Sequence, residues 1–399
     1  MLHRLSFFAL SLAFVSLAGA DWRQFRGNDA TGVTDEKHLP TKLDEQSIAW
    51  KAPLPGRGLS APIVIGDRVV VTASSGPRQD RLHVLCFDAA TGKPRWERQL
   101  WATGRTMTHP KTSVAAPTPA SDGKRIFASY SSNDVAAYDL DGNLLWFRGL
   151  GHDYPNASNS LGMASSPVVV GDTLVLQVEN DSESFAVGLD TATGVNRWKN
   201  DRPIRANWTS PSIIRGKTSQ EDAVLLQSSA STVCCEPATG RTLWTFAEGC
   251  STIPSGAVQG DTVYVPSNGV VALRHVAGSL APEKLWQEAK LDPATASPLA
   301  YGDLLFTVSR AGVLKAADLK TGQVKWQLRL KGSFSGTPVA GAGHLYFVNE
   351  DGDVLIVKPG AESGEIVSES KLGETILCTP AISNGAIYVR SDANLWKLK

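Results

Sequence analysis

The stretch FDAATGKPRW (87–96) recurs along the chain as LDTATGVNRW (189–198), CEPATGRTLW (235–244) and ADLKTGQVKW (317–326), with a shortened copy, YDLDGNLLW (138–146). In all five copies a glycine stands four residues before a tryptophan. A motif that returns at a regular spacing is the signature of a repeat architecture. The fold is therefore predicted from the repeat.

The residue types in this motif indicate a tight turn followed by a strand. An Asp side chain can accept backbone N–H bonds within its own turn, and Gly adopts the positive φ that closes such a turn. The tryptophan then offers a large apolar face. We expect it to pack between neighbouring sheets.

A second mark, usually a small residue followed by proline, precedes each unit. It is followed in most cases by a run of β-branched and aromatic residues, which indicates a strand. The eight copies are APIVIGD (61–67), TPASDG (118–123), SPVVVGD (166–172), SPSIIRG (210–216), SGAVQGD (255–261), SPLAYGD (297–303), TPVAGAG (337–343) and TPAISNG (379–385). Units of four strands, spaced by roughly 40–50 residues, predict an all-β, eight-bladed β-propeller with four-stranded antiparallel blades.

The two ends of the repeat region predict how the ring closes. The last unit (379–399) ends where its third strand ends, so its fourth strand is missing. An unpaired tryptophan strand, SIAWKAPL (47–54), precedes the first complete unit. We expect this N-terminal strand to complete the last blade, which would leave no open sheet edge. Residues 21–399 would then form one propeller.

The N-terminus and the composition limit the function classes. Residues 1–20 have a basic start, an apolar run and a small-x-small site ending at Ala20, which predicts a cleaved signal peptide. The mature chain is expected in the periplasm or outside the cell, without a transmembrane segment, as a monomer. Lys+Arg and Asp+Glu both number 39. This balance argues against a nucleic-acid partner.

With the DWRQFRG opening (21–27), the repeats resemble the pyrroloquinoline-quinone-type (quinoprotein-like) propeller family of exported bacterial proteins. The resemblance covers nearly all of the mature chain. The family includes quinone-dependent dehydrogenases and also a non-enzymatic lipoprotein propeller of the outer-membrane assembly machinery. It implies that a cofactor would lie on the face made by the loops that enter each blade.

Two adjacent cysteines, Cys234 and Cys235, raise the question of a vicinal disulfide. Aligned on the turn, they occupy a small slot and an apolar slot that other units also fill. Free cysteine behaves as a small hydrophobe, and neighbouring strand residues point to opposite faces. Both cysteines are therefore predicted to be structural, beside a turn at the end opposite the cofactor face.

Two long loops between units are the candidate functional region, because long loops on a rigid scaffold concentrate function. They span 101–117 and 148–167, and a shorter loop spans 204–211. The stretch QVENDSESF (177–185) is expected to solvate a hairpin, although its carboxylates are also candidates for cation binding. The candidate ligand-binding residues, which we expect either to converge over the channel or to be ordinary solvated loop residues, are His109, His152, Asp153, Arg205 and Trp208.

Two functions from different classes follow. The first is an exported, non-catalytic scaffold that binds a protein, peptide or polysaccharide on its loop face. The second is an oxidoreductase that uses pyrroloquinoline quinone with calcium, which rests on fold kinship alone. A weaker third possibility is a hydrolase or lyase that uses the His/Asp loops. The calcium ligands and catalytic Asp that the resemblance implies do not map onto this sequence, so no catalytic, cofactor or metal residue is assigned.

Overall fold

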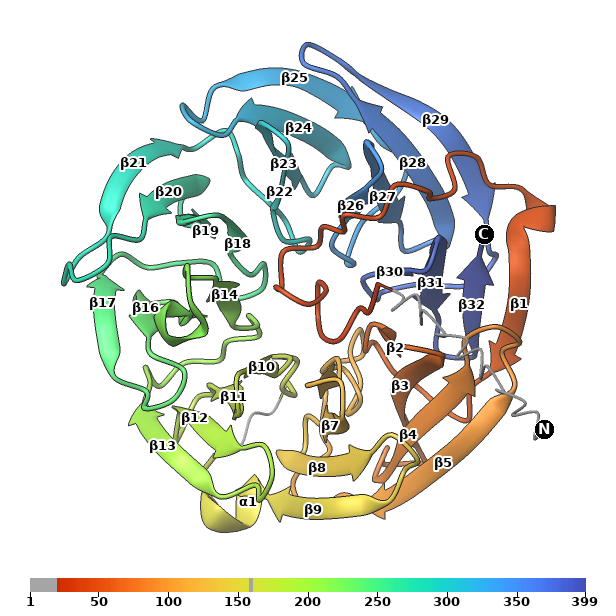
Figure 1. The fold of residues 1–399 in the computed structure, drawn as a ribbon, viewed down its shortest axis with the longest axis vertical. Helices are drawn as coiled ribbons and strands as arrows, with labels where there is room; N and C mark the ends of the chain where they lie inside the picture. Colours follow the sequence, from red (N-terminus) through yellow and green to blue (C-terminus); the bar gives the residue numbers. More distant parts are fainter. Residues whose placement is uncertain (1–19, 158–160) are drawn as a thin grey trace, which may run out of the picture.

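The computed structural model describes residues 20–157 and 161–399. Apart from Ala20, the expected signal peptide lies outside the described residues. Thirty-two strands form eight four-stranded antiparallel sheets arranged as blades around a central axis (Figure 1). The all-β, eight-bladed propeller predicted from the repeat is confirmed.

Within each blade, strands A to D run from the axis outward. Blade 1 consists of β2 (Ile63–Ile65), β3 (Arg68–Ser75), β4 (Arg81–Asp88) and β5 (Pro94–Trp101), and blade 2 of β6 (Ala120–Ser121), β7 (Arg125–Ser129), β8 (Asp134–Asp139) and β9 (Leu144–Gly149). Blade 3 consists of β10 (Val168–Val170), β11 (Thr173–Val178), β12 (Phe185–Asp190) and β13 (Asn196–Asp201), and blade 4 of β14 (Ser212–Ile214), β15 (Ala223–Gln227), β16 (Thr232–Cys235) and β17 (Thr242–Phe246).

Blades 5 to 8 follow the same order. Blade 5 consists of β18 (Ala257–Gln259), β19 (Thr262–Pro266), β20 (Val270–Arg274) and β21 (Glu283–Glu288), and blade 6 of β22 (Leu299–Tyr301), β23 (Leu304–Val308), β24 (Val313–Asp318) and β25 (Val324–Arg329). Blade 7 consists of β26 (Val339–Gly341), β27 (His344–Val348), β28 (Asp353–Pro359) and β29 (Gly364–Lys371), and blade 8 of β30 (Ala381–Ser383), β31 (Ala386–Arg390), β32 (Asn394–Leu398) and β1 (Ile48–Pro53). The short helices are η1 (Glu45–Ser47), α1 (Leu150–Asp153) and η2 (Ser219–Glu221).

The ring closes as the sequence predicts. Strand β1 pairs antiparallel with β32 and supplies the missing outer strand of blade 8. Figure 1 shows β1, in red, beside the blue C-terminal strands. Because the first and last segments share one sheet, blade 8 has its full four strands and the ring is closed.

The repeated turn has the geometry expected from its residue types. In blade 1, the Asp88 carboxylate accepts hydrogen bonds from the backbone N–H groups of Ala90 and Thr91 and from the Thr91 hydroxyl. Gly92 follows with φ +70°. A Cβ atom on Gly92 would lie 2.6 Å from the Trp50 ring, so the indole rests directly on the glycine.

Trp50 belongs to blade 8, not to blade 1, and the same displacement by one blade is found at six of the eight seams. At these seams the indole packs on the turn of the following blade, and its Nε1–H donates to a backbone carbonyl of that turn. The pairs of tryptophan and glycine are Trp50 with Gly92, Trp96 with Gly142, Trp146 with Gly194, Trp198 with Gly240, Trp286 with Gly322, and Trp326 with Gly364.

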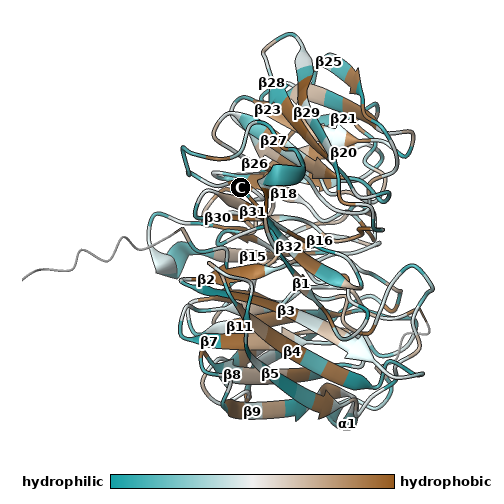
Figure 2. Ribbon diagram, turned by 90° about the vertical axis from the view of Figure 1, so that its right-hand side faces the viewer, coloured by the Kyte–Doolittle hydropathy of each residue, from teal (hydrophilic) through white to brown (hydrophobic). Residues whose placement is uncertain are grey.

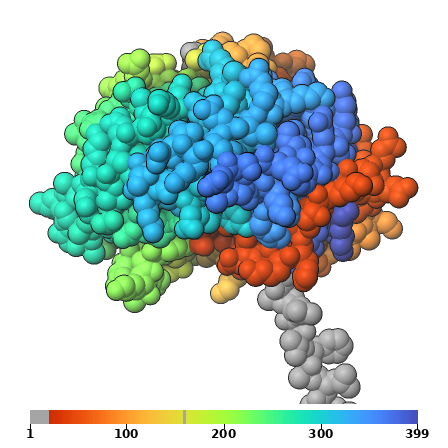
Figure 3. All heavy atoms as spheres, turned by 90° about the horizontal axis from the view of Figure 1, so that it is seen from above, coloured from red at the N-terminus to blue at the C-terminus, as the bar shows by residue number. Residues whose placement is uncertain are grey.

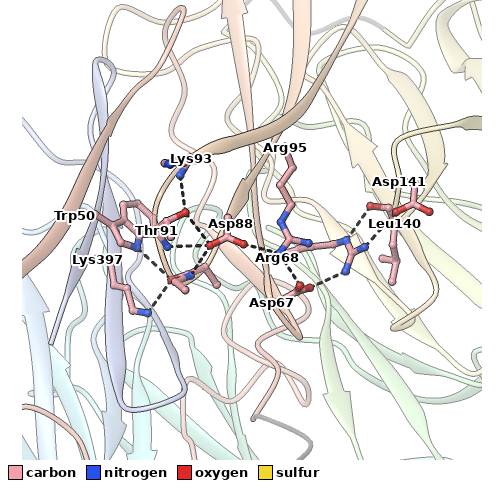
Figure 4. Close-up of polar contacts among 12 residues, drawn as sticks. Trp50, Asp67, Arg68, Asp88, Thr91, Lys93, Arg95, Leu140, Asp141 and Lys397 are labelled. Carbon is pink, nitrogen blue, oxygen red and sulfur yellow. Dashed lines mark hydrogen bonds and ion pairs between the residues drawn. The ribbon is translucent and has the colours of Figure 1, made fainter. Parts of the chain in front are cut away.

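Charged side chains reinforce these seams at the surface. Figure 4 shows the region where blades 8, 1 and 2 meet. Lys397 of blade 8 donates to the Ala89 carbonyl of blade 1, 2.7 Å away. Arg68 of blade 1 reaches Leu140 and Asp141 of blade 2 at 3.0 and 3.2 Å. The turns therefore hold neighbouring blades together as well as reversing the chain.

The hydrophobic core is divided among the seams between blades. One buried cluster, for example, joins Val84 and Cys86 of blade 1 to Ile126 and Tyr138 of blade 2. Figure 2 shows hydrophobic residues along the strands, with hydrophilic residues frequent in the connections. Because both faces of inner strands are covered, these strands are almost continuously apolar.

Candidate functional site

The strand order gives the ring two different faces. The A–B and C–D turns lie on one side, which we call the turn face. The B–C loops and the loops that enter each blade before strand A lie on the other, which we call the mouth face. The candidate site lies on the mouth face, where the central channel opens into a well.

Two rings of side chains line this well, with a pair from the entry of each of seven blades and Leu59 alone from blade 1. The outer ring consists of Leu59, Ala116, Ala164, Trp208, Ile253, Thr295, Ser335 and Leu377. The inner ring, two residues later in each blade, consists of Thr118, Ser166, Ser210, Ser255, Ser297, Thr337 and Thr379. The well has a volume of about 200 Å³. It is a direct product of the second repeated mark, since the inner-ring residue is the one before proline or glycine.

The inner ring is held together by hydrogen bonds between blades. In seven steps around the ring, each hydroxyl oxygen accepts the backbone N–H of the preceding blade's equivalent residue. The distances range from 2.9 to 3.1 Å. In blade 1 the equivalent position is Ala61, which has no hydroxyl, so the chain of bonds starts there and ends at Thr379.

The N-terminal arm, residues 20–44, closes the other end of the channel. Figure 1 shows it crossing the centre of the ring, and Figure 3 shows it, in red, spread over one face. Trp22 bridges to Val64 of blade 1, while Val33 bridges to Ala340 of blade 7. Phe25 lines the well. The well is therefore blind, with the arm as its floor.

Two buried arginines lie close to the well. Arg26 of the arm donates to the carbonyls of Gly256 and Pro298, 2.9 Å away in each case. Arg390 of blade 8 donates to the Thr72 carbonyl at 2.7 Å and to the Ser60 hydroxyl at 3.3 Å. Burial lowers the pKa of both guanidinium groups to about 10.

Neither arginine has a sequence pattern that marks it as a binding residue. Arg26 stands in the DWRQFRG opening, whose pattern carries only the family resemblance. Arg390 ends a β-rich run with the pattern of any second strand. For Arg390, the one sequence feature that could have indicated a special role is a basic residue at the end of an otherwise apolar strand.

The entry loop of blade 2, residues 101–117, spreads over the mouth face. The His109 backbone N–H donates to the Leu161 carbonyl in the entry loop of blade 3, at 2.9 Å. The Pro110 carbonyl accepts from Arg57 of blade 1 at 3.1 Å. Lys111 forms an ion pair of 3.1 Å with Glu350 of blade 7. This loop thus contacts both neighbouring blades and also blade 7, which lies three blades away around the ring.

The structure separates the five candidate residues into two groups. Trp208 lines the well and donates through Nε1 to the Gly162 carbonyl at 2.7 Å. His109 is exposed on the blade 2 entry loop, and Arg205 is exposed four residues after β13 ends. These three residues lie in entry loops, which form part of the mouth face.

His152 and Asp153 lie at the outer rim, in α1. Figure 1 shows α1 outside β9 and β13, away from the channel. Asp153 forms an ion pair with Arg148, which also bonds the Gly194 carbonyl of blade 3. The Asp153 carboxylate is therefore engaged in a seam between blades.

The expectation that Glu179 would solvate a hairpin is wrong. Glu179 is buried and forms an ion pair of 2.6 Å with buried Arg202. Gln177 and Asn207 donate to its two oxygens at 2.8 and 3.0 Å. Burial raises the pKa of Glu179, although Arg202 opposes the shift. This network joins blades 3 and 4 below the 204–211 loop, and long-range pairing of this kind has no local sequence signal.

The adjacent cysteines occupy the two faces of β16, as strand geometry requires. Cys234 packs in the cluster shared with blade 5, and Cys235 packs in the cluster shared with blade 3. Both are fully buried free thiols. Burial raises the pKa of Cys235 to about 12 and shifts that of Cys234 upward as well. Their packing role is confirmed.

The lining of the well does not supply the calcium site that accompanies pyrroloquinoline quinone. Calcium takes six to eight oxygen ligands, from carboxylates, carbonyls and water. The lining residues are hydroxyl, small and aliphatic, with Trp208 and Phe25 as the aromatic members and no acidic side chain. Within residues 20–157 and 161–399, no three His, Cys, Asp or Glu side chains are grouped to hold a metal.

Fold and site together define an eight-bladed propeller of the quinoprotein-like class. The family model described as outer membrane protein assembly factor BamB matches residues 24–245, 228–333 and 281–358, and the chain belongs to this family. No curated protein sequence matches the chain. Among the described residues, no helix has the length and apolar character that a bilayer crossing needs.

Solved structures share the fold at low identity. BamB from Moraxella catarrhalis is 15% identical, with a TM-score of 0.60 over 88% of this chain and 97% of that chain. Quinohemoprotein alcohol dehydrogenase from Comamonas testosteroni is 12% identical, with a TM-score of 0.67 over 95% and 80%. A europium-containing methanol dehydrogenase is 12% identical, with a TM-score of 0.70 over 94% and 90%. These likenesses establish the architecture alone.

Proposed function

We propose that this protein is an exported, non-catalytic scaffold that binds a partner protein through its mouth face. The proposal builds on membership of a family described as an assembly factor. Export rests on the signal peptide expected at residues 1–20, and the proposed location is the periplasm. The observation that carries the binding face is the distribution of exposed apolar side chains.

Exposed apolar residues on the mouth face gather over consecutive blade entries. They are Trp101, Met107, Leu161, Ile204 and Ile253, which lead into blades 2 to 5. Among the described residues, the entries of blades 6, 7, 8 and 1 carry no exposed large apolar side chain. An exposed apolar arc of this kind is typical of a protein-binding surface.

The arc is supported by bonds between its loops. His109 contacts Leu161 through the backbone, and Trp208 bonds both Gly162 and the Thr252 carbonyl. A surface held in place before binding loses less conformational entropy when the partner docks. A protein partner fits this apolar arc better than a polysaccharide, which needs many polar contacts.

Site-specific photo-crosslinking in cells tests the proposal. A photoreactive residue replaces Ile204, which is 70% exposed on the mouth face, or Val195, which is 62% exposed on the turn face. We expect a discrete protein adduct from position 204 and none from position 195. An Ile204→Glu substitution should reduce crosslinking from a second probe at position 107. Equal adducts from both faces would contradict the proposal.

The oxidoreductase alternative has a separate test. The purified mature protein is titrated by calorimetry with pyrroloquinoline quinone, with and without Ca²⁺. The scaffold proposal expects no saturable heat. Saturable binding at micromolar concentration or tighter, about −8 kcal/mol or better, would overturn the non-catalytic assignment and lead to dye-linked dehydrogenase assays.

A further inference from the structure

The inner ring of the well is a ring of hydrogen-bond donors. Each of its seven hydroxyl oxygens is buried and accepts a backbone N–H. A Ser or Thr hydroxyl also carries one hydrogen to donate. Within the described part of the chain, no acceptor receives any of these seven hydrogens. The hydrogens remain available to a guest in the well.

Two buried positive charges flank this ring. Arg26 bonds the carbonyls of Gly256 and Pro298, each one residue after an inner-ring serine. Arg390 bonds Ser60, the neighbour of Ala61 at the gap in the ring. Neither guanidinium forms an ion pair with a described residue, and Arg26 Nε and Arg390 Nη2 have no hydrogen-bond partner.

Unpaired buried charge is costly, because burial removes water and nothing of opposite sign replaces it. Here the hydrogen bonds of both guanidinium groups go to carbonyl and hydroxyl oxygens, and Arg390 has in addition only a coulombic attraction to Cys378 and Asp392 that is weaker than the effect of its burial. An anion in the well would accept from the hydroxyl ring, and the two arginines, which bond to the neighbours of inner-ring positions without lining the well, would attract it from behind the ring. It would also interact in a medium of low dielectric constant, where attraction is strong.

We propose that the channel well binds a small oxyanion, of the size of sulfate, phosphate or a short carboxylate. Its oxygens would accept hydrogen bonds from the inner-ring hydroxyls, and Arg26 and Arg390 would supply the compensating charge. The volume of about 200 Å³ admits such an anion with a few waters. This site lies below the apolar arc and goes beyond the proposed scaffold function.

The composition of the well excludes other classes of ligand. A cation would meet hydroxyl hydrogens and two positive charges, without a lining carboxylate. A neutral polyol would gain the donors but would leave the arginine charges unbalanced. The preference for an anion over a neutral molecule of equal size is therefore the property to measure.

The test is calorimetric titration of the purified mature protein with sodium sulfate and sodium phosphate at constant ionic strength. Glycerol is the neutral comparison. We expect saturable binding of at least one oxyanion and none of glycerol in the same concentration range. Equal binding of glycerol, or no saturable binding of either anion below 50 mM (about 2 kcal/mol of binding free energy), would overturn the proposal.

Variants connect binding to the ring. Thr337→Val keeps the side-chain shape, removes one donor, and should weaken binding about 3- to 10-fold, the range of one hydrogen bond to an anion. Ala61→Ser supplies the missing eighth hydroxyl and should tighten binding about threefold. Ser129→Ala removes a buried hydroxyl outside the ring and should leave affinity unchanged.

The charge contribution is measured with Arg390→Met, which should reduce binding at least tenfold. If this variant does not fold, the gain expected from Ala61→Ser still decides the matter. Binding that is unchanged in both Thr337→Val and Ala61→Ser would show that the anion binds elsewhere and would overturn the site.

Discussion

The turn face and the mouth face of this propeller follow different rules. On the turn face, one short motif recurs, and its aspartate, glycine and tryptophan make the same contacts from blade to blade. On the mouth face, the entry loops differ in length, and beyond the repeated hydrogen bonds of the inner ring their side chains make contacts that are not repeated. The turn face is constrained because it joins the blades, whereas loops outside the seams are free to acquire function.

Two seams of the turn face depart from the tryptophan–glycine rule. The outer strand of blade 7, β29, contains no tryptophan, and the seam between blades 4 and 5 uses a different acceptor. The Trp244 indole of blade 4 meets His275 of blade 5 instead of an Asp-Gly turn. Its Nε1–H donates to His275 Nδ1 at 2.8 Å. The acceptor has changed, but the buried donor is still satisfied. Burial lowers the pKa of His275, which favours the neutral ring that can accept.

The largest expected difference between the faces is in the tryptophans. Trp198→Ala removes a buried indole from the seam of blades 3 and 4 and should lower the free energy of unfolding by about 3–5 kcal/mol. Trp101→Ala, at a 62% exposed mouth-face position, should change it by less than about 0.5 kcal/mol. Urea unfolding followed by fluorescence and circular dichroism measures both. Similar losses would remove the distinction.

The next effect concerns the turn glycines. Gly92→Ala places a Cβ 2.6 Å from Trp50 at a positive φ, and it should cost about 2–4 kcal/mol from overpacking and backbone strain. Gly66→Ala is the control, because that glycine also has a positive φ but no atom within 4 Å of a Cβ. It should cost about 1 kcal/mol. Thermal and urea unfolding distinguish the two variants.

The irregular seam gives an intermediate effect. His275→Ala leaves the buried Trp244 N–H without an acceptor and should cost about 1–3 kcal/mol. Replacing His275 with Gln retains an acceptor and should recover part of the loss. If both variants unfold at the same urea concentration, the hydrogen bond does not determine the stability of this seam.

The smallest effect depends on pH. A hydrogen bond from Arg95, with further bonds from Thr91, lowers the pKa of Asp88 to about 2. A carboxyl with a lowered folded-state pKa stabilises the protein above its unfolded value near 4, and this stabilisation is lost as the pH falls toward 2. Asp88→Asn should therefore be less stable than wild type at pH 5–7, by less than about 1 kcal/mol.

This difference should shrink as the pH falls from 4 to 2, where unfolding of both proteins is followed at matched ionic strength. Asp190→Asn is a parallel case, because Arg197 lowers the pKa of Asp190 to about 2 in the same way. A difference that stays constant over this range would show that the Asp88 contribution is steric and not electrostatic.

Much of the fold could be predicted because its signals are local. Turn residues, alternating strands and the small-Pro mark each depend on a few neighbouring positions, and their repetition identified eight blades. The unpaired strand at 47–54 even predicted how the ring closes. What remained hidden were partners far apart in sequence, such as Glu179 with Arg202 and Arg26 with Pro298.

The candidate site shows the same limit. The sequence drew attention to the long loops, and the structure places Trp208 in the well but Asp153 in a rim ion pair. The hydroxyl residues of the inner ring are present in the sequence, in the second repeated motif. That they surround one well depends on eight blades meeting around a common axis, and the sequence of a single repeat does not show this.

By itself, the sequence determined the blade, its turn chemistry and the number of repeats, because these depend on backbone conformation and on contacts between near neighbours. Only the tertiary structure decided that six outer-strand tryptophans pack on a glycine of the next blade, that the N-terminal arm closes the channel, and that seven hydroxyl-bearing residues line one well. Those features depend on ring closure, which brings distant residues together through packing rather than local propensity.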